Sequence, residues 1–467
     1  MKNNTRADDG GPGELARRDF LRLAGAGAFG LGLAERLAGT AFGAAAATGN
    51  AAPAKSLIQL ALWGGMTQFE TWDPKPNAAP EYKSAFKSIP TNVPGIEISE
   101  LLPKMAQIAD KYAILRAVMN PRTGHGDANY VMIANAPYPS DVISTHPTGK
   151  LVYPAVAAII GMKMRESGRY DGEIPAWVCC GKPPSGIDES FLGPKYKAYT
   201  ANPKGQAGLN EQQRQRLASR RDLLATIHPG SKTGGAASNE VASLRENVFE
   251  VMTSDAQKVF DLTDETDETK DRYGRTELGQ ACLLARRLAE YGVPAISVPW
   301  SGTRTEDGKQ YGWDMHTELN ASVRALCPIL DQTLSALITD LEERGILDRT
   351  IVVLFSENGK APHFSNEDQG TGKPNGTKSG RNHWGRGFSV VIAGGGFKGG
   401  RTVGQMDDNG ELLVSRPIYP WDLWESVYAQ MGIDPHDTLP NTSGCVAYVS
   451  QADACGLSRG GRLTELL

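Results

Sequence analysis

The stretch TIVVLFSENGK, residues 350–360, decides the fold. Its first six residues form an unbroken run of β-branched and apolar side chains. A strand without alternating polar positions has no face for water, which is typical of a strand covered on both sides in a parallel sheet. The run stops abruptly, and the Asn-Gly pair that follows is by itself a turn signal. Two interpretations stay open: Glu357 and Asn358 simply end a strand, or the strand carries a carboxylate and a carboxamide to a metal ion.

Comparable apolar runs, separated by helical patterns, occur on both sides of this stretch. We predict further strands at 55–63, 112–118, 295–300 and 388–396. Helices are predicted at 98–110, 277–292, 319–345 and 420–432, the third of them as one helix or as two that meet at Pro328. The alternation predicts the α/β fold class, with a doubly wound, mostly parallel sheet. Ligands of such sheets bind beyond the carboxyl ends of the strands.

The first 50 residues have the pattern of a targeting segment. Arg17 and Arg18 precede a weakly hydrophobic Gly/Ala-rich run that ends in an Ala-x-Ala choice at residues 45–47. This pattern is typical of a twin-arginine export signal. A membrane helix is the alternative, but Glu35 and Arg36 leave no apolar stretch of about 20 residues. We therefore predict a periplasmic or extracellular mature protein without a stable membrane span.

The rest of the chain, residues 51–467, is predicted to be one domain. Residues 138–275 are rich in loop-forming residues, and we interpret them as an elaboration of the core. The net charge of -4 and the pI near 6.1 offer no basic surface for nucleic acid. The six cysteines include no C-x-x-C pair, which argues against zinc-ribbon and thioredoxin-like sites. The expected partners are small molecules or envelope glycans.

Ligand-type side chains lie beside the predicted strands at four separate places. They are Glu70 and Asp73 after 55–63, Asp314 and His316 after 295–300, Glu357 and Asn358 after 350–355, and His383 with Arg381 and Arg386 before 388–396. Carboxylate and carboxamide oxygens suit hard cations, and imidazole nitrogens suit zinc-like ions. Each residue alone could be a turn cap, a packed ring or an ordinary surface side chain. Together they favour a metal site, because clustered carboxylates repel unless a cation joins them.

An ordered series of motifs extends over nearly the whole chain. The motifs are LARRDFLRLAGAG, GGMTQFETWDPKP, GHGDANYVMIANAPY, FLGPKYKAY, RYGRTELGQACLLARRLAEYGV, GWDMH, DLEERGILDRTIVVLFSENGK, RNHWGRGFSVVIAGGGFKGG and GGRLTELL. This series closely resembles the bacterial domain of unknown function 1501 family. These are twin-arginine-exported, sulfatase-like proteins that are grouped with the alkaline phosphatase superfamily. The resemblance implies a doubly wound α/β sheet, one or two metal ions and a nucleophile at a helix N-terminus.

The resemblance also implies roles for particular residues. It marks Glu357 and Asn358 as metal ligands, because they are similar to the Asp-Asn pair of sulfatases. It also marks Asp314 and His316, which look like an Asp/His pair of two-metal relatives. A further ligand position falls on Glu70, with Asp73 as the alternative. His383 resembles a superfamily histidine that binds metal or an oxyanion.

The motif that would carry the nucleophile departs from the sulfatase pattern. Sulfatases have Cys or Ser at this position, whereas the present chain has His125, with Thr123 as the only hydroxyl nearby. No cysteine is available there to become formylglycine, which argues against ordinary sulfatase chemistry. The Asp-His ligand pair of alkaline phosphatases is missing at residues 357–358, which argues against a full two-zinc site.

The leading hypothesis is an exported, metal-dependent hydrolase of sulfate or phosphate esters, acting on a small-molecule or glycan ester. Its cofactor would be a divalent metal, either calcium, magnesium or zinc. The catalytic candidates are His125, Thr123, His383 and Arg381, and the anion-binding candidates are Lys360 and Arg386. The alternative, from another class, is a non-catalytic envelope or glycan-binding protein on a hydrolase-derived scaffold.

Overall fold

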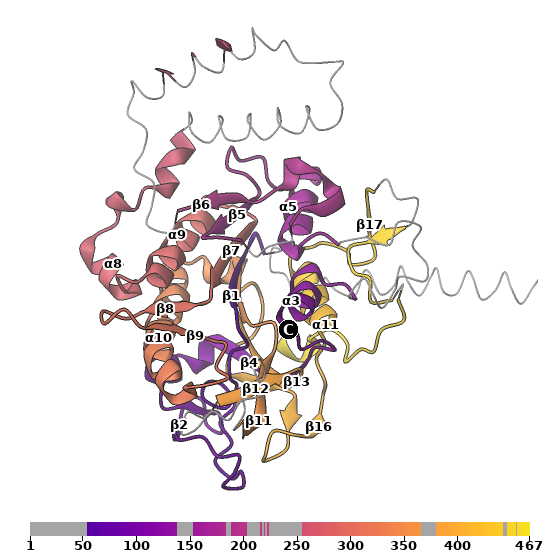
Figure 1. Ribbon diagram of the computed structural model, residues 1–467. Coiled ribbons are helices and arrows are strands. Elements are labelled where there is room, and N and C mark those ends of the chain that lie inside the picture. The colour runs from indigo at the N-terminus through magenta and orange to yellow at the C-terminus, as the bar shows by residue number, and fades with distance from the viewer. Residues whose placement is uncertain are drawn as a thin grey trace, which may run out of the picture. The chain divides into compact units, whose positions relative to one another are not determined.

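Eight strands form one central sheet in the computed structural model (Figure 1). They are β1 (Ser56–Leu62), β4 (Tyr112–Met119), β5 (Trp177–Cys180), β6 (Tyr199–Ala201), β7 (Ala295–Trp300), β10 (Thr350–Phe355), β13 (Arg386–Ala393) and β14 (Arg401–Val403). Their order across the sheet is β14-β4-β13-β10-β1-β7-β5-β6. The structure describes residues 54–137, 153–183, 188–202, 255–365, 380–441, 446–453 and 455–467, with residues 215, 216, 219, 222 and 223.

The sheet is parallel except at one strand. β1 pairs in parallel with β10 and β7, β5 pairs in parallel with β7 and β6, and β14 pairs in parallel with β4. Only β13 runs antiparallel to its neighbours β10 and β4 within this sheet of described strands. The predicted fold class, a mostly parallel α/β sheet, is confirmed, and all five predicted strands belong to it.

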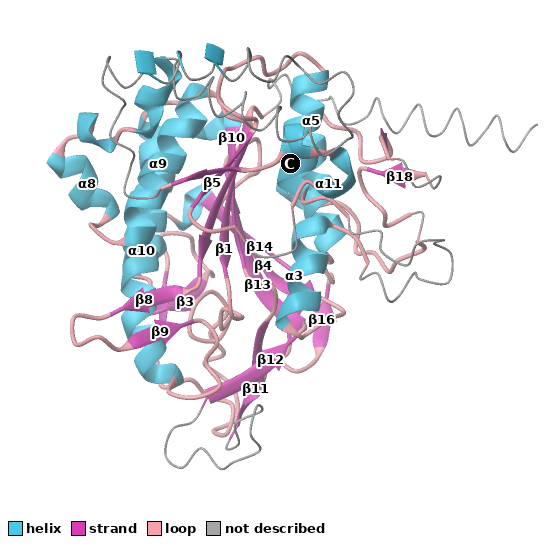
Figure 2. Ribbon diagram, turned by 45° about the horizontal axis from the view of Figure 1, so that its top comes forward, coloured by secondary structure: helices cyan, strands magenta, loops and turns pink. Residues whose placement is uncertain are grey.

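Two layers of helices cover the two faces of the sheet (Figure 2). On one side lie α9 (Glu277–Tyr291) and α10 (Leu319–Glu343), and on the other lie α3 (His125–Ala134), α5 (Val156–Glu166) and α11 (Pro420–Gln430). Every residue of β1 and β10 is buried. Along β1, Ile58 and Leu60 pack into the core beneath α9 and α10, while Leu57 and Ala61 pack into the opposite core. Burial on both faces is why most residues of these strands are apolar and why their few polar residues, Ser56, Gln59 and Thr350, are buried as well.

Local signals fix the ends of α9. The side chain of Thr276 accepts a hydrogen bond from the backbone N–H of Gly279 and caps the first turn. Gly292, with φ of 100°, ends the helix in the left-handed conformation. The following helix, α10, is one continuous helix with Pro328 inside it, so the two-helix interpretation of 319–345 is wrong.

Two segments differ from their predicted structure. The predicted helix at 98–110 is reduced to a short strand, β3 (Glu97–Ser99), the four-residue helix α2 (Pro103–Ala106) and a 3-10 turn. Pro103 is the reason, because its ring and missing N–H prevent a helix from continuing into it from the preceding residues. The loop-rich region 138–275 contributes α5, β5 and β6, so the sheet extends further than the sequence predicted.

The predicted export signal lies outside the described residues, as does most of the polar loop between residues 364 and 381. Within the described part of the chain, no helix has the length and apolar character needed to cross a bilayer.

Candidate functional site

The direction of the strands brings distant segments together at one edge of the sheet. β1, β7, β10 and β4 all end at this edge, so the residues that follow each of them meet there. β13 runs in the opposite direction and therefore begins at the same edge. His383 reaches it from β12 (Gly380–Trp384), which precedes β13 and pairs with β11 (Gly359–Ser365).

Asp314 is the centre of the site. Its Oδ1 atom lies 3.0 Å from Nε2 of His316 and 3.1 Å from Nε2 of His383. Its Oδ2 atom lies 3.2 Å from Nε2 of His125. The two nitrogens of His316 and His383 lie 3.1 Å from each other. Asp314 itself is 46% exposed, so this cluster opens to solvent.

His125 stands at the N-terminus of α3, between two carboxylates. Its Nδ1 atom lies 2.6 Å from Oε1 of Glu357, which is fully buried, while its Nε2 atom faces Asp314. Hydrogen bonds to Asp314 and Glu357 raise the pKa of His125 to about 9. At neutral pH the metal-free imidazole is therefore protonated and donates to both carboxylates.

Charged partners also shift the other groups of the cluster. Burial opposes the charge of Asp314, but hydrogen bonds from His125, His316 and His383 hold the pKa of Asp314 well below its usual range. Burial lowers the pKa of His383, against the pull of Asp314. Burial likewise lowers the pKa of Lys360. A cluster of perturbed groups beside an open edge is typical of a functional site.

Ligand-type atoms of His125, Asp314 and His383 lie within 4.8 Å of one another, close enough to hold a metal ion. Zinc–ligand bonds of 2.0–2.1 Å place neighbouring ligands of a tetrahedron about 3.3 Å apart. The contacts of Asp314 Oδ1 with His316 and His383, and of these two imidazoles with each other, are 3.0 to 3.1 Å and lie close to this value, whereas His125 approaches the other oxygen, Oδ2, at 3.2 Å. His316 Nδ1 lies 3.2 Å from Oδ1 of Asn382, an acceptor. With a metal bound, Nδ1–H would donate to Asn382 and Nε2 would be the ligand atom, in place of the hydrogen bond that Nε2 makes to Asp314 without metal.

The loop after β1 supports the cluster with its backbone. The N–H of Gly64 donates to Glu357 Oε1 at 2.8 Å, and the Gly64 carbonyl accepts from Lys360 Nζ at 2.9 Å. The hydroxyl of Ser356 accepts from the N–H groups of Gly65 and Met66 and donates to the Leu62 carbonyl. The buried carboxylate of Glu357 is thus held in place by two strand ends at once.

Asn358 and Thr123 also lie beside the cluster, where a hydrogen bond joins them. The Nδ2 atom of Asn358 donates to the carbonyl of Thr123 at 2.8 Å, which fixes the loop that leads into α3. Its Oδ1 atom is buried and has no hydrogen-bond partner. Thr123 itself is exposed. An unpartnered buried acceptor is costly, so Asn358 Oδ1 is a second sign that a cation binds nearby.

Two predicted site residues form a separate, buried ion pair. Arg381 Nη2 lies 3.4 Å from Glu70 Oε1, and both side chains are fully buried. Arg381 also donates to the carbonyls of Ala361 and Tyr82 and stacks on two phenylalanine rings. The guanidinium already pairs with Glu70, so the structure shows these two side chains as a buried ion pair.

The remaining predicted residues lie in different places. Asp73 pairs with Lys75 at 2.9 Å and with Arg116 at 3.5 Å, and all three line a cavity of about 400 Å³. Lys360, predicted to bind an anion, is instead fully buried and bonded to Asp314 at 3.2 Å. Arg386 is exposed at the start of β13, opposite Met119 at the end of β4. Of the predicted anion-binding residues, only Arg386 is presented to solvent.

Sequence reasoning missed the residues that act through the backbone or through short side chains. Three such residues hold Glu357 in place. The N–H of Gly64 and the hydroxyl of Ser356 bond to its carboxylate, and Asn120 Nδ2 donates to its backbone carbonyl at 2.8 Å. The only signal was the Gly64-Gly65 pair directly after an apolar strand, which indicates a close backbone approach.

The variant Gly64→Ala is expected to lower the free energy of unfolding by about 2 kcal/mol. It is also expected to weaken metal binding by about tenfold or more. Gly64 has φ of +121°, and an added Cβ would lie 2.4 Å from the backbone nitrogen of Asp314. Denaturant unfolding and zinc titration measure the two effects. Gly95→Ala is the control, since Gly95 has φ of +84° with open space around it. Equal effects in both variants would show that strain alone, and not the contact with Asp314, matters.

Fold and site together define an α/β protein with a metal-type polar cluster at the carboxyl edge of its sheet. The chain belongs to the family described as "Protein of unknown function (DUF1501)", whose sequence model matches residues 54–454. A search of curated proteins found no match.

Solved structures with a similar architecture include members of the alkaline phosphatase superfamily. The PsFucS1 sulfatase from Pseudoalteromonas sp. is 12% identical, with 85% of this chain and 73% of that chain covered and a TM-score of 0.36. An alkaline phosphatase superfamily protein from Vibrio parahaemolyticus is 10% identical, with coverage of 82% and 67% and a TM-score of 0.39. The phosphonate monoester hydrolase of Agrobacterium radiobacter is 13% identical, with coverage of 89% and 77% and a TM-score of 0.37.

Proposed function

We propose that the chain is an exported, metal-dependent hydrolase of sulfate or phosphate esters. The observation that carries the proposal is the convergence of three imidazoles, from His125, His316 and His383, on the carboxylate of Asp314. These groups come from three separate segments of the chain and meet at the edge where such sheets bind ligands. Nothing in the packing of the core requires this arrangement, because Asp314 is partly exposed.

The donor set favours a zinc-like ion over calcium or magnesium. Three imidazole nitrogens and one carboxylate oxygen suit zinc, whereas calcium and magnesium prefer oxygen ligands alone. His125, Asp314 and His383 have ligand atoms within 4.8 Å of one another, and we assign His316, whose Nε2 lies 3.1 Å from that of His383, as a fourth donor. A bound divalent ion would polarise the ester oxygen and stabilise the negative charge that develops on the transferred group.

The residues around the cluster supply orientation and binding. Glu357 accepts from Nδ1 of His125 and so fixes the direction of that ring, as carboxylates behind metal-binding histidines commonly do. The first turn of α3 has no side-chain cap at Gly124, so its backbone N–H groups remain available for the oxygens of a sulfate or phosphate group. Arg386 is the exposed cation that we assign to the same anion.

The reaction in this proposal adds water across the ester bond and gives an alcohol and inorganic sulfate or phosphate. Thr123, which directly precedes the cap of α3, is the candidate for a hydroxyl nucleophile. The paired arginines at residues 17 and 18 support export, and an envelope location would bring the site into contact with glycan esters.

The test is made on the purified chain without its first 50 residues. We expect a stoichiometric zinc-like metal by elemental analysis, and turnover of p-nitrophenyl phosphate or p-nitrophenyl sulfate that a chelator abolishes and zinc restores. Absence of both metal and turnover contradicts the proposal. Bound metal without turnover of any aryl ester would favour the non-catalytic glycan-binding alternative.

A further inference from the structure

A polar cavity lies beyond the carboxyl end of β14. Its volume of about 400 Å³ falls within the range of about 300–1,000 Å³ that ligand pockets occupy. It is lined by residues 73–77 in the loop after β1, by Arg116 of β4, and by a segment from Thr402 to Ser415. This last segment contains the short hairpin of β15 (Gln405–Met406) and β16 (Leu413–Ser415). No residue of the imidazole cluster lines the cavity.

Hydrogen bonds hold the walls of the cavity in place. The N–H of Ala79 donates to Oδ1 of Asn409 at 3.1 Å, and Nζ of Lys75 donates to the carbonyl of Met406 at 3.4 Å. Arg116 donates to two backbone carbonyls, through Nε at 3.0 Å and through Nη2 at 2.6 Å. The cavity therefore has its shape before any ligand arrives, which lowers the cost of ordering on binding.

Asp73 brings an acceptor to this cavity that the protein itself does not satisfy. The residue is 2% exposed, and its Oδ1 lies 3.5 Å from Nε of Arg116. Its Oδ2 is buried and, although it lies 2.9 Å from Nζ of Lys75, it accepts no hydrogen bond within the described structure. A buried acceptor without a hydrogen bond is costly, so a ligand that donates to it would be stabilised.

The side chains of the lining define the chemistry of that ligand. Carboxylates, here Asp73 and Asp408, only accept hydrogen bonds, whereas Lys75 and Arg116 only donate them. An inorganic anion only accepts and would face both carboxylates, and a metal ion would face both cations. A hydroxyl group both donates and accepts. Neighbouring hydroxyl groups on one neutral molecule therefore match this lining best.

We propose that the cavity binds a neutral sugar residue of a glycan. The inference goes beyond the proposed function, because sugar binding here needs no metal ion. β4 and β14 lie two to four strand positions from β10 and β1 in the sheet. At about 4.8 Å per strand this is a separation of about 10 to 19 Å, so the sugar site and the imidazole cluster are distinct.

The experiment titrates the purified chain with four neutral disaccharides, namely maltose, cellobiose, lactose and chitobiose. Binding is followed by calorimetry and by ligand-observed nuclear magnetic resonance, with the protein treated with a chelator and again with zinc added. We expect at least one disaccharide to bind with a Kd in the millimolar range, equally with and without zinc. Sodium sulfate at the same concentration is expected not to displace it.

Two variants locate the binding, and one serves as the matched control. Ser415→Trp fills the cavity from an exposed position on β16 and is expected to weaken binding at least about tenfold. Asn77→Ala removes an exposed amide of the lining and is expected to weaken it about threefold. Val414→Trp is the control, because Val414 is 56% exposed, does not line the cavity and directs its side chain to the other face of the same strand.

The outcomes separate this inference from the proposed function. Binding of none of the four disaccharides up to about 10 mM overturns it and leaves a cavity filled by solvent. Displacement of the sugar by sulfate overturns it in favour of an anion site. A sugar that binds Ser415→Trp as tightly as Val414→Trp occupies another place, which also overturns it. Loss of metal and turnover with sugar binding intact contradicts only the proposed function.

Discussion

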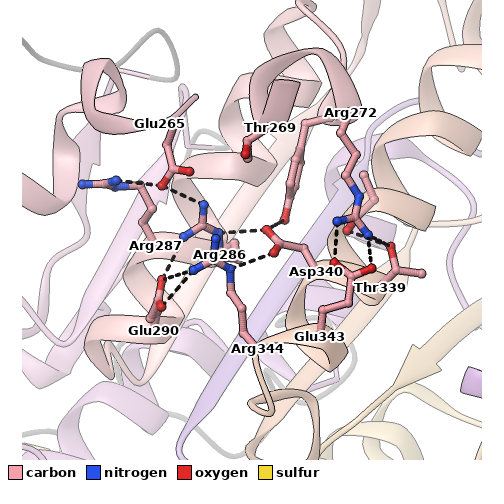
Figure 3. Close-up of polar contacts among 12 residues, drawn as sticks. Glu265, Thr269, Arg272, Arg286, Arg287, Glu290, Thr339, Asp340, Glu343 and Arg344 are labelled. Atoms are coloured by element: carbon pink, nitrogen blue, oxygen red, sulfur yellow. Dashed lines mark hydrogen bonds and ion pairs between the residues drawn. The ribbon is translucent and has the colours of Figure 1, made fainter. Parts of the chain in front are cut away.

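The variant Arg286→Met is expected to lower the free energy of unfolding by about 3 kcal/mol. Arg286 is 1% exposed at the contact between α9 and α10, where it forms ion pairs with Glu265 at 2.7 Å, Glu290 at 2.8 Å and Asp340 at 3.1 Å (Figure 3). Methionine fills the volume of the arginine stem but leaves these carboxylates without their shared cation. Chemical denaturation measures the change.

The expected loss is at the lower end of what a broken buried pair costs, because neighbouring arginines remain. Arg287 still pairs with Glu265 at 2.7 Å, and Arg344 still pairs with Asp340 at 2.7 Å. Asp340 also keeps a hydrogen bond from the hydroxyl of Tyr273 at 2.9 Å. No carboxylate of the network is therefore left entirely alone.

Arg272→Met is the matched control within the same group of helices (Figure 3). Arg272 is 36% exposed, and its partner Glu343 is 58% exposed. Solvent screens such a pair, so we expect a loss of about 1 kcal/mol or less. If Arg286→Met costs no more than Arg272→Met, the buried network does not contribute the stability assigned to it here.

The central strands could be predicted from the sequence because burial on both faces imposes a composition. β10 and β1 have no polar position that could face solvent, so their runs of apolar residues mark them without further information. β5 and β6, with four and three residues, are too short to show a pattern. β5 pairs with β7, and β6 pairs with β5, which only the folded chain reveals.

In the site, too, some residues could be predicted from the sequence and others could not. Glu357 follows β10 directly, and Asp314 and His383 belong to the segments that follow β7 and precede β13, so the topology of the sheet brings all three to one edge. Glu70 also follows a strand, but its side chain turns inward to Arg381. A carboxylate in the core and a carboxylate at a metal look alike in a sequence, because the partner that decides between them lies 311 residues away.

The variant Asp314→Asn is expected to weaken zinc binding by more than about a hundredfold. Asparagine keeps the shape of aspartate and one oxygen acceptor, so the variant removes the charge with the least disturbance. Without that charge, His125, His316 and His383 lose the carboxylate on which they converge. Lys360 loses the carboxylate that lies 3.2 Å from its Nζ. Zinc titration by calorimetry measures the affinity, and thermal unfolding without metal shows whether the variant is folded.

Asp307→Asn provides the control, since Asp307 is an exposed aspartate in the turn between β8 (Gly302–Arg304) and β9 (Gln310–Gly312), just upstream of Asp314. We expect it to bind zinc as the wild type does. Turnover of an aryl ester should fall with zinc affinity in Asp314→Asn and stay unchanged in Asp307→Asn. A folded Asp314→Asn variant with wild-type zinc affinity would place the metal away from the imidazoles. The proposed reaction would then lose the metal site on which it depends.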